Sequence, residues 1–114
     1  MSELGDLQRK FAKEVPRLID RAHELGFEVT LGDAFRDPRV FGKVGERIGY
    51  GHPNSAHKNK LAIDLNLYRD GVYLTSTEEH KPLGAWWEDQ APENRWGGRF
   101  NDGNHYSKIY RGVM

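Results

Sequence analysis

The sequence of 114 residues contains no cysteine. Disulfide bonds and cysteine-rich structural zinc sites are therefore excluded. The sequence also lacks an apolar run near the roughly 20 residues that a membrane-spanning helix needs. Residues 1–13 are charged and lack the apolar segment of a signal peptide. We therefore expect no membrane span and a protein that is cytoplasmic when it is made.

Neither sign of charge is in excess, because 17 lysine and arginine residues balance 17 aspartate and glutamate residues. A chain without a net positive field has little attraction for polyanions, which argues against nucleic acid as the main partner. Hydrophobic residues make up 37% of the sequence, enough for a modest core. The length suits one compact domain and is too short for two. We expect a single monomeric domain over residues 1–114.

The first segment has the apolar spacing of an amphipathic helix that ends near Gly26. Pro16 lies inside this pattern and predicts a kink or a break. Alternation over residues 27–31 predicts a short strand with one buried face. Residues 38–50 predict at most a short helix, and residues 51–54 predict a loop. The apolar positions of the first helix are Leu4, Leu7, Phe11, Val15, Leu18, Ile19, Ala22 and Leu25.

Residues 61–68 have the clearest strand pattern of the chain. Apolar side chains alternate there with polar ones, and Asp64 falls on the polar face. Asp70-Gly71 is typical of a two-residue hairpin turn, with a return strand over residues 72–74. The pattern therefore predicts an antiparallel hairpin directly after Asp64.

Ser76 and Glu79 have the spacing of a capping box at the start of a helix over residues 77–89. Gly97 and Gly98 predict a tight turn, and residues 104–110 predict a last strand. The whole pattern indicates an α+β domain with a small, mostly antiparallel sheet flanked by helices.

Two imidazoles and a carboxylate from distant segments have the composition of a metal site. Asp64 lies on the polar face of its strand, His57 precedes that strand, and His105 would begin the last strand. If the two strands are neighbours, the three side chains converge on one ion. Zn²⁺ suits two neutral imidazoles and a carboxylate better than Ca²⁺ or Mg²⁺, which prefer oxygen ligands. Asp102 would then act as general base, and Arg36 would bind a substrate carboxylate or an oxyanion.

Each of these residues also has an ordinary structural interpretation. Arg36 alone is more often a surface ion-pair partner, and Asp102-Gly103 alone is more often a plain turn. Most histidines in a domain of this kind lie at the surface or form hydrogen bonds, which is what we expect of His23, His52 and His80. Trp86 and Trp87 fit a core better than a sugar-binding platform.

The sequence resembles a known enzyme family at these same residues. Residues 55–64 form the pattern S-x-H-x-x-K-x-A-x-D, and residues 102–105 form the pattern D-x-x-H. Both are similar to the paired motifs of VanY-like zinc D-Ala-D-Ala carboxypeptidases and L-alanyl-D-glutamate endopeptidases. This group belongs to the superfamily of lysostaphin, D-Ala-D-Ala peptidases and Sonic hedgehog. Residues 61–68 and 96–100 look most like the phage and prophage endolysin branch.

The resemblance implies a role for each matching position. It implies a small antiparallel sheet with one zinc ion in a cleft on its open face, and it makes Asp102 the catalytic base. Arg36 resembles a substrate-positioning arginine, and Ser55 matches a serine that binds substrate or orients the loop. Lys60 departs from the family, because the motif has glycine at that position, and lysine there would strain the loop if the glycine's backbone geometry matters. The implied zinc ligands are His57, Asp64 and His105.

The expected function is hydrolysis of the L-alanyl-D-glutamate bond in the stem peptide of peptidoglycan by a zinc peptidase. The resemblance implies a bacteriolytic endolysin that reaches the cell wall through a membrane pore. A D-Ala-D-Ala carboxypeptidase or dipeptidase is the alternative with the same chemistry. A zinc-containing binding module without catalysis is a third reading, against which the intact Asp102 argues.

Overall fold

The computed structural model describes residues 2–47 and 54–114, and the predicted loop over residues 51–54 falls largely outside them. The chain begins with a long helix, α1 (Glu3–Glu24), which Ser2 caps by accepting a hydrogen bond from the backbone of Gly5. The helix continues through Pro16 without interruption, so the predicted break is wrong. A proline removes only one backbone hydrogen bond, and the apolar face of α1 is held on the core along its whole length.

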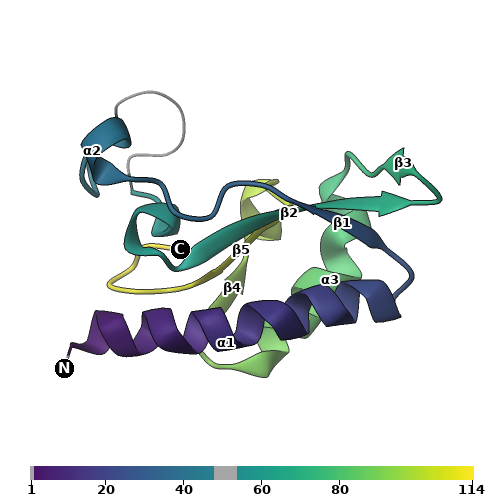
Figure 1. The fold of residues 1–114 in the computed structure, drawn as a ribbon, viewed down its shortest axis with the longest axis horizontal. Helices are drawn as coiled ribbons and strands as arrows, with labels where there is room; N and C mark the ends of the chain where they lie inside the picture. The colour runs from purple at the N-terminus through teal and green to yellow at the C-terminus, as the bar shows by residue number, and fades with distance from the viewer. Residues whose placement is uncertain (1, 48–53) are drawn as a thin grey trace.

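The sheet is antiparallel and has the strand order β1-β2-β5-β4, with the short strand β3 paired to β2 (Figure 1). Its strands are β1 (Glu28–Leu31), β2 (Ala62–Arg69), β3 (Val72–Tyr73), β4 (Asn94–Trp96) and β5 (His105–Lys108). The predicted α+β class is confirmed, while β4 has no counterpart among the predictions. β1 is an edge strand, so Leu31, expected on a buried face, is 69% exposed.

In the middle of the chain, the hairpin turn and the start of the following helix form at the predicted residues. Asp70 and Gly71 both adopt positive φ, as a tight hairpin turn requires, and connect β2 to β3. Helix α3 (Thr77–Gln90) follows, and its capping box joins Ser76 and Glu79. Between residues 38 and 47 the one helix is α2 (Pro38–Phe41).

One hydrophobic core lies between the sheet and the two long helices. α1 runs along one side of the sheet in Figure 1, and α3 contacts both α1 and β4. The alternating apolar side chains of β2 point to this side, which leaves the opposite face of β2 to Asp64 and its polar neighbours. Among the described residues, no helix has the length and apolarity to cross a membrane. The main core residues are Phe11, Leu18, Ala22, Leu61, Ile63, Leu65, Leu67, Leu83, Trp87 and Tyr106.

Candidate metal centre and its cleft

The structure brings His57, Asp64 and His105 together. β2 and β5 are neighbours, and their register places Asp64 directly opposite His105. His57 comes from a short 3-10 helix, η1 (Ala56–Asn59), where a loop was predicted. One ligand atom from each of the three residues lies within 4.8 Å of the other two. This group could therefore hold a metal ion.

The surroundings of His57 fix which ring nitrogen faces the site. Its Nδ1 donates a hydrogen bond to the Ala34 carbonyl oxygen at 2.7 Å. In a neutral ring Nε2 then carries only a lone pair, yet it lies 3.1 Å from Oδ1 of Asp64, which is also an acceptor. Two acceptors at this distance need a proton or a cation between them. Tetrahedral ligands with bonds of roughly 2.0–2.1 Å lie about 3.3 Å apart, so the spacing fits a shared metal ion.

His105 shows the same fit from the other side of the carboxylate. Its Nδ1 lies 3.5 Å from Oδ1 of Asp64, and its ring centroid is 5.0 Å from that of His57. Its Nε2 is buried and has no hydrogen-bond partner among the described residues. Partial burial tends to raise the pKa of Asp64, but hydrogen bonds and charge from the two imidazoles outweigh it and lower that pKa to about 2. Asp64, the third candidate ligand, is therefore a carboxylate at any physiological pH.

The glycine position of the motif does require an unusual backbone conformation. Lys60 ends η1 with φ 58° and ψ 33°, which is the left-handed region. Glycine adopts this region freely, whereas other residues pay a steric penalty of roughly 1–2 kcal/mol. Lys60 keeps the conformation, and its ammonium lies 5.1 Å from the centre of the Phe35 ring. The expected strain is thus present, and the chain retains the turn that aims His57 at Asp64.

The other predicted site residues line the same cavity of about 530 Å³. Arg36 is 6% exposed, so it is no ordinary surface ion-pair partner. Its Nη1 donates to Ser55 Oγ at 2.9 Å, and its Nη2 lies 3.4 Å from Oδ2 of Asp33. Ser55 also caps η1 by accepting a hydrogen bond from the backbone of His57. Ser55 therefore links the guanidinium to the segment that carries His57.

Asp102 lies on the cavity wall beside the three candidate ligands. Partial burial raises the pKa of Asp102, and the charge of Asp64 adds to this, while the charge of His105 acts in the opposite direction. The backbone of Asp102 is held on both sides, because its N–H donates to the Gly97 carbonyl at 3.0 Å and its carbonyl accepts from the N–H of His105 at 3.1 Å. A carboxyl group with a raised pKa at such a position suits proton transfer.

Several residues of the cleft had no signal of their own in the sequence. The carbonyl of Ala34 orients His57, and a backbone group leaves no trace in residue type. Gly97, predicted only as part of a turn, begins the 3-10 helix η2 (Gly97–Phe100) at a point where a side chain would collide with Asp102 and His105. Phe100 lines the cavity and is 62% exposed.

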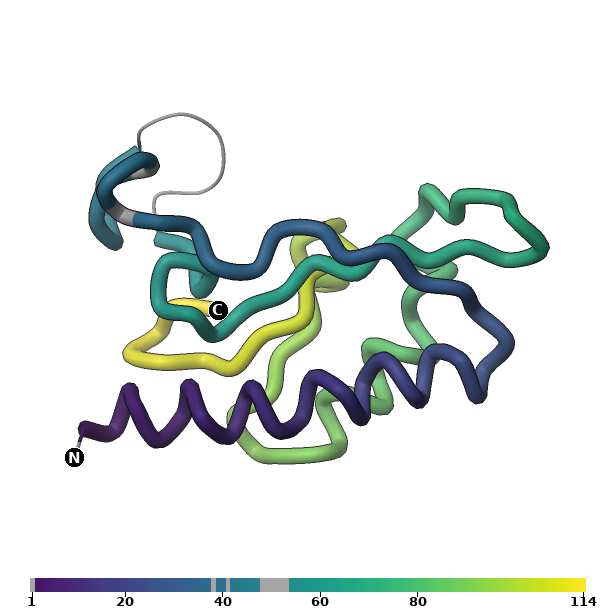
Figure 2. The backbone as a smooth tube through the Cα atoms, in the orientation of Figure 1, coloured from purple at the N-terminus to yellow at the C-terminus, as the bar shows by residue number. Residues whose placement is uncertain are grey.

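The C-terminal segment also contributes to the cleft. Gly112 and Met114 line the same cavity as His57, and Figure 2 shows the end of the chain close to the segment around η1. A turn between Tyr110 and Val113 folds the chain back, with backbone hydrogen bonds of 3.0 and 2.9 Å between these two residues. The cleft is therefore bounded on this side by residues that belong to neither motif.

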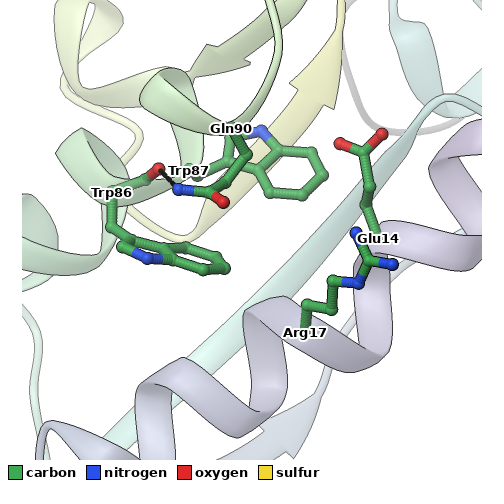
Figure 3. A pocket seen from close by; sticks show the side chains of 5 residues that line it. All are labelled: Glu14, Arg17, Trp86, Trp87 and Gln90. Carbon is green, nitrogen blue, oxygen red and sulfur yellow. Dashed lines mark hydrogen bonds between the residues drawn. The ribbon is translucent and has the colours of Figure 1, made fainter.

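His23, His80 and Trp87 have the structural roles expected of them. His23 is exposed on α1, His80 is buried and hydrogen-bonded to the Tyr106 hydroxyl at 3.0 Å, and His52 lies outside the described residues. Trp87 is part of the core, with its Nε1 donating to two backbone carbonyls. Trp86 borders a small second cavity of about 70 Å³ between α1 and α3 (Figure 3). Its size suits water rather than a substrate.

Comparison with known proteins identifies the fold. No family model matches the sequence, and no curated protein matches it. The structure is similar to the crystal structure of the Serratia marcescens L-Ala D-Glu endopeptidase ChiX, with a TM-score of 0.59 and 17% sequence identity. The match covers 96% of this chain and 89% of that chain. The chain thus has the fold of that endopeptidase, with a candidate metal centre on the open face of its sheet.

Proposed function

We propose that this protein is a zinc-dependent peptidoglycan peptidase that hydrolyses the L-alanyl-D-glutamate bond of the stem peptide. The observation that carries the proposal is the meeting of His57, Asp64 and His105 beside Asp102 in a cavity of about 530 Å³. The similarity to an L-Ala D-Glu endopeptidase supports the choice of bond. A lytic role in a phage or prophage, with release through a membrane pore, stays a prediction from the sequence.

The donor set suits one zinc ion. Two imidazoles and a single carboxylate make three ligands, which leaves a fourth tetrahedral position for water or substrate. When bound, zinc would supply Lewis acidity, polarising a carbonyl group and lowering the pKa of water to roughly 7. The hydrogen bond from His57 to the Ala34 carbonyl holds the ring in the tautomer that leaves Nε2 available.

The protein's own groups supply proton transfer and substrate orientation. Asp102 would accept a proton from the attacking water and deliver it to the amine that leaves, a role for which its raised pKa prepares it. Arg36 is held by Ser55 and lines the cavity, so it would bind an anionic group of the substrate or the developing oxyanion.

Digestion of purified peptidoglycan by the zinc-loaded protein tests the proposal. Mass spectrometry should find new amino termini on D-glutamate. A D-Ala-D-Ala carboxypeptidase is the second candidate, because Arg36 lines the cavity and its guanidinium suits a free terminal carboxylate. Release of D-alanine without new D-glutamate termini would establish that activity and refute the endopeptidase.

A matched variant separates catalysis from metal binding alone. Asp102→Asn keeps the shape of the side chain but removes the basic group, so we expect normal zinc content and a fall in kcat of about 10²–10⁴-fold. Full turnover in this variant would exclude Asp102 as general base. A wild-type protein that binds zinc and cleaves neither bond would favour the binding-module alternative.

A further inference from the structure

A row of polar side chains continues from the candidate metal centre along the open face of the sheet. Asp64, Asn66 and Tyr68 alternate on β2, so all three point away from the core. The register places Tyr73 of β3 opposite Tyr68. Figure 1 shows the β2–β3 hairpin extending from the body of the sheet, at the end of the molecule opposite α2.

From the metal centre, the accessible part of the open face extends along β2 toward Tyr68 and not toward Ala62. Two residues before Asp64 on the same face, Ala62 is 1% exposed, and its partner Ser107 on β5 is fully buried. In the other direction Asn66 and Tyr68 are half-buried, and Tyr73 is 49% exposed. A long substrate that leaves the cleft along β2 must therefore pass over these three side chains.

Contacts among these side chains hold them in place before any ligand binds. Oδ1 of Asn66 accepts hydrogen bonds from Nδ2 of Asn104 at 3.2 Å and from the Tyr73 hydroxyl at 3.5 Å. The Thr30 hydroxyl donates to the Tyr68 hydroxyl at 3.3 Å. The rings of Tyr68 and Tyr73 lie 5.4 Å apart at an angle of 47°. Side chains ordered in this way lose little conformational entropy on binding.

The side-chain polar atoms of this row that make no hydrogen bond within the described part of the protein are suited to binding an amide group. Within the part of the chain that the structure describes, Nδ2 of Asn66 and Oδ1 of Asn104 make no hydrogen bond to protein, although the two amides contact each other. They offer a donor beside an acceptor, which is the complement of an acetamido group. The neighbouring tyrosine rings add apolar surface with polar edges, as a sugar ring requires.

We propose that this row, formed by Asn66, Asn104, Tyr68 and Tyr73, binds the N-acetylated sugar to which the stem peptide is attached. The inference rests on the proposed function, since L-alanine joins the stem peptide to that sugar. The L-alanyl-D-glutamate bond is thus one residue, roughly 3.5 Å, from the point of attachment. Asp64 and Tyr68 are four strand residues apart, about 13 Å, so the sugar would reach the row if the N-terminal side of the stem peptide follows β2 from the metal centre.

Two matched substrates test the proposal. One is a free stem peptide beginning with L-alanine, and the other is the same peptide attached to N-acetylmuramic acid, both assayed with zinc-loaded protein. We expect the wild-type kcat/KM to be at least tenfold higher for the sugar-linked peptide. Tyr73→Ala and Asn66→Ala should each lower that preference severalfold. Val72→Ala is the control, because Val72 is 64% exposed on the same short strand and outside the row.

The outcomes distinguish this inference from the proposed function. Cleavage of both substrates with equal kcat/KM would overturn the sugar site and leave the peptidase intact, as would an unchanged preference in both variants. Cleavage of neither substrate would instead count against the proposed function. In that case, titration of zinc-loaded protein with the sugar-linked peptide, followed by amide NMR, still tests the row. Shifts at the row that Tyr73→Ala removes would support it, and their absence would refute it.

Discussion

Alanine in place of Gly97 should damage both the fold and the metal centre. An ideal Cβ at this position would lie 2.3 Å from the carbonyl oxygen of Asp102 and 2.8 Å from Cβ of His105. Neither atom can rotate away, so the two segments must separate. Overpacking of this kind costs roughly 1–3 kcal/mol, and about 2 kcal/mol in a domain of this size corresponds to a fall in Tm of about 8 °C.

The same displacement moves His105 relative to Asp64. Disturbing the support of a metal ligand typically lowers metal affinity by about 10–100-fold, so we expect zinc affinity to fall within that range. Thermal unfolding of the metal-free protein and competitive zinc titration measure the two effects separately.

Gly5→Ala is the matched control for this substitution. Gly5 lies in α1, where an added Cβ would meet no backbone atom: it would lie 3.4 Å from the flexible end of Arg9 and 3.1 Å from the capping hydroxyl of Ser2, which needs to shift by only a few tenths of an ångström. Helix propensity favours alanine there by up to about 1 kcal/mol, so Tm should stay constant or rise. If Gly97→Ala kept the wild-type Tm and zinc affinity, η2 would not pack against the ligand segment as described.

Two further predictions concern the pH dependence of the metal centre and the buried lysine. Zinc affinity should fall as the pH is lowered from 8 to 5, by up to about a hundredfold per pH unit where both imidazoles take up a proton, because both must be neutral to bind. Asp64, with its pKa lowered to about 2, stays ionised throughout, so an affinity that is constant in zinc titrations would exclude imidazole ligands. Lys108 is fully buried, and its ammonium is paired with Glu14 and Glu93 at 3.0 Å each. Replacing both carboxylates with glutamine should lower the free energy of unfolding by about 3–5 kcal/mol in urea titrations, because the buried ammonium is left without a counter-charge. Adding Lys108→Met to that variant removes the buried charge as well and should restore part of the loss; equal losses would refute this account.

Local patterns in the sequence were sufficient for most of the secondary structure. Three of these patterns depend only on residues a few positions apart in the sequence: the apolar spacing of α1, the Asp70-Gly71 turn and the capping box at Ser76. Strand β4 was missed because it has three residues and no alternation, and its neighbour β5 determines it. The pairing of Lys108 with Glu14 was equally invisible, since it joins residues 94 positions apart.

In the candidate site, too, the sequence predicted the residue types, while the packing of distant segments determined their orientation. Residue type and motif spacing named His57, Asp64, Asp102 and His105, because metal and proton chemistry admits few kinds of side chain. Their roles stay predictions until metal and turnover are measured. The spacing could not say which imidazole nitrogen faces the carboxylate. That follows from the Ala34 carbonyl, whose position depends on how the loop after β1 packs against η1.

The sequence by itself determined the chemical inventory: an α+β chain without cysteine, carrying two imidazoles and two carboxylates in motifs that suit a hydrolase. Only the tertiary structure decided that Asp64 and His105 face each other across neighbouring strands, that Gly97 leaves room for them, and that the open face continues toward Tyr73. The physical reason is the distance along the chain over which each effect acts. Backbone propensity and side-chain chemistry act within a few residues, whereas distances between ligands depend on strand register and packing between segments far apart in the chain.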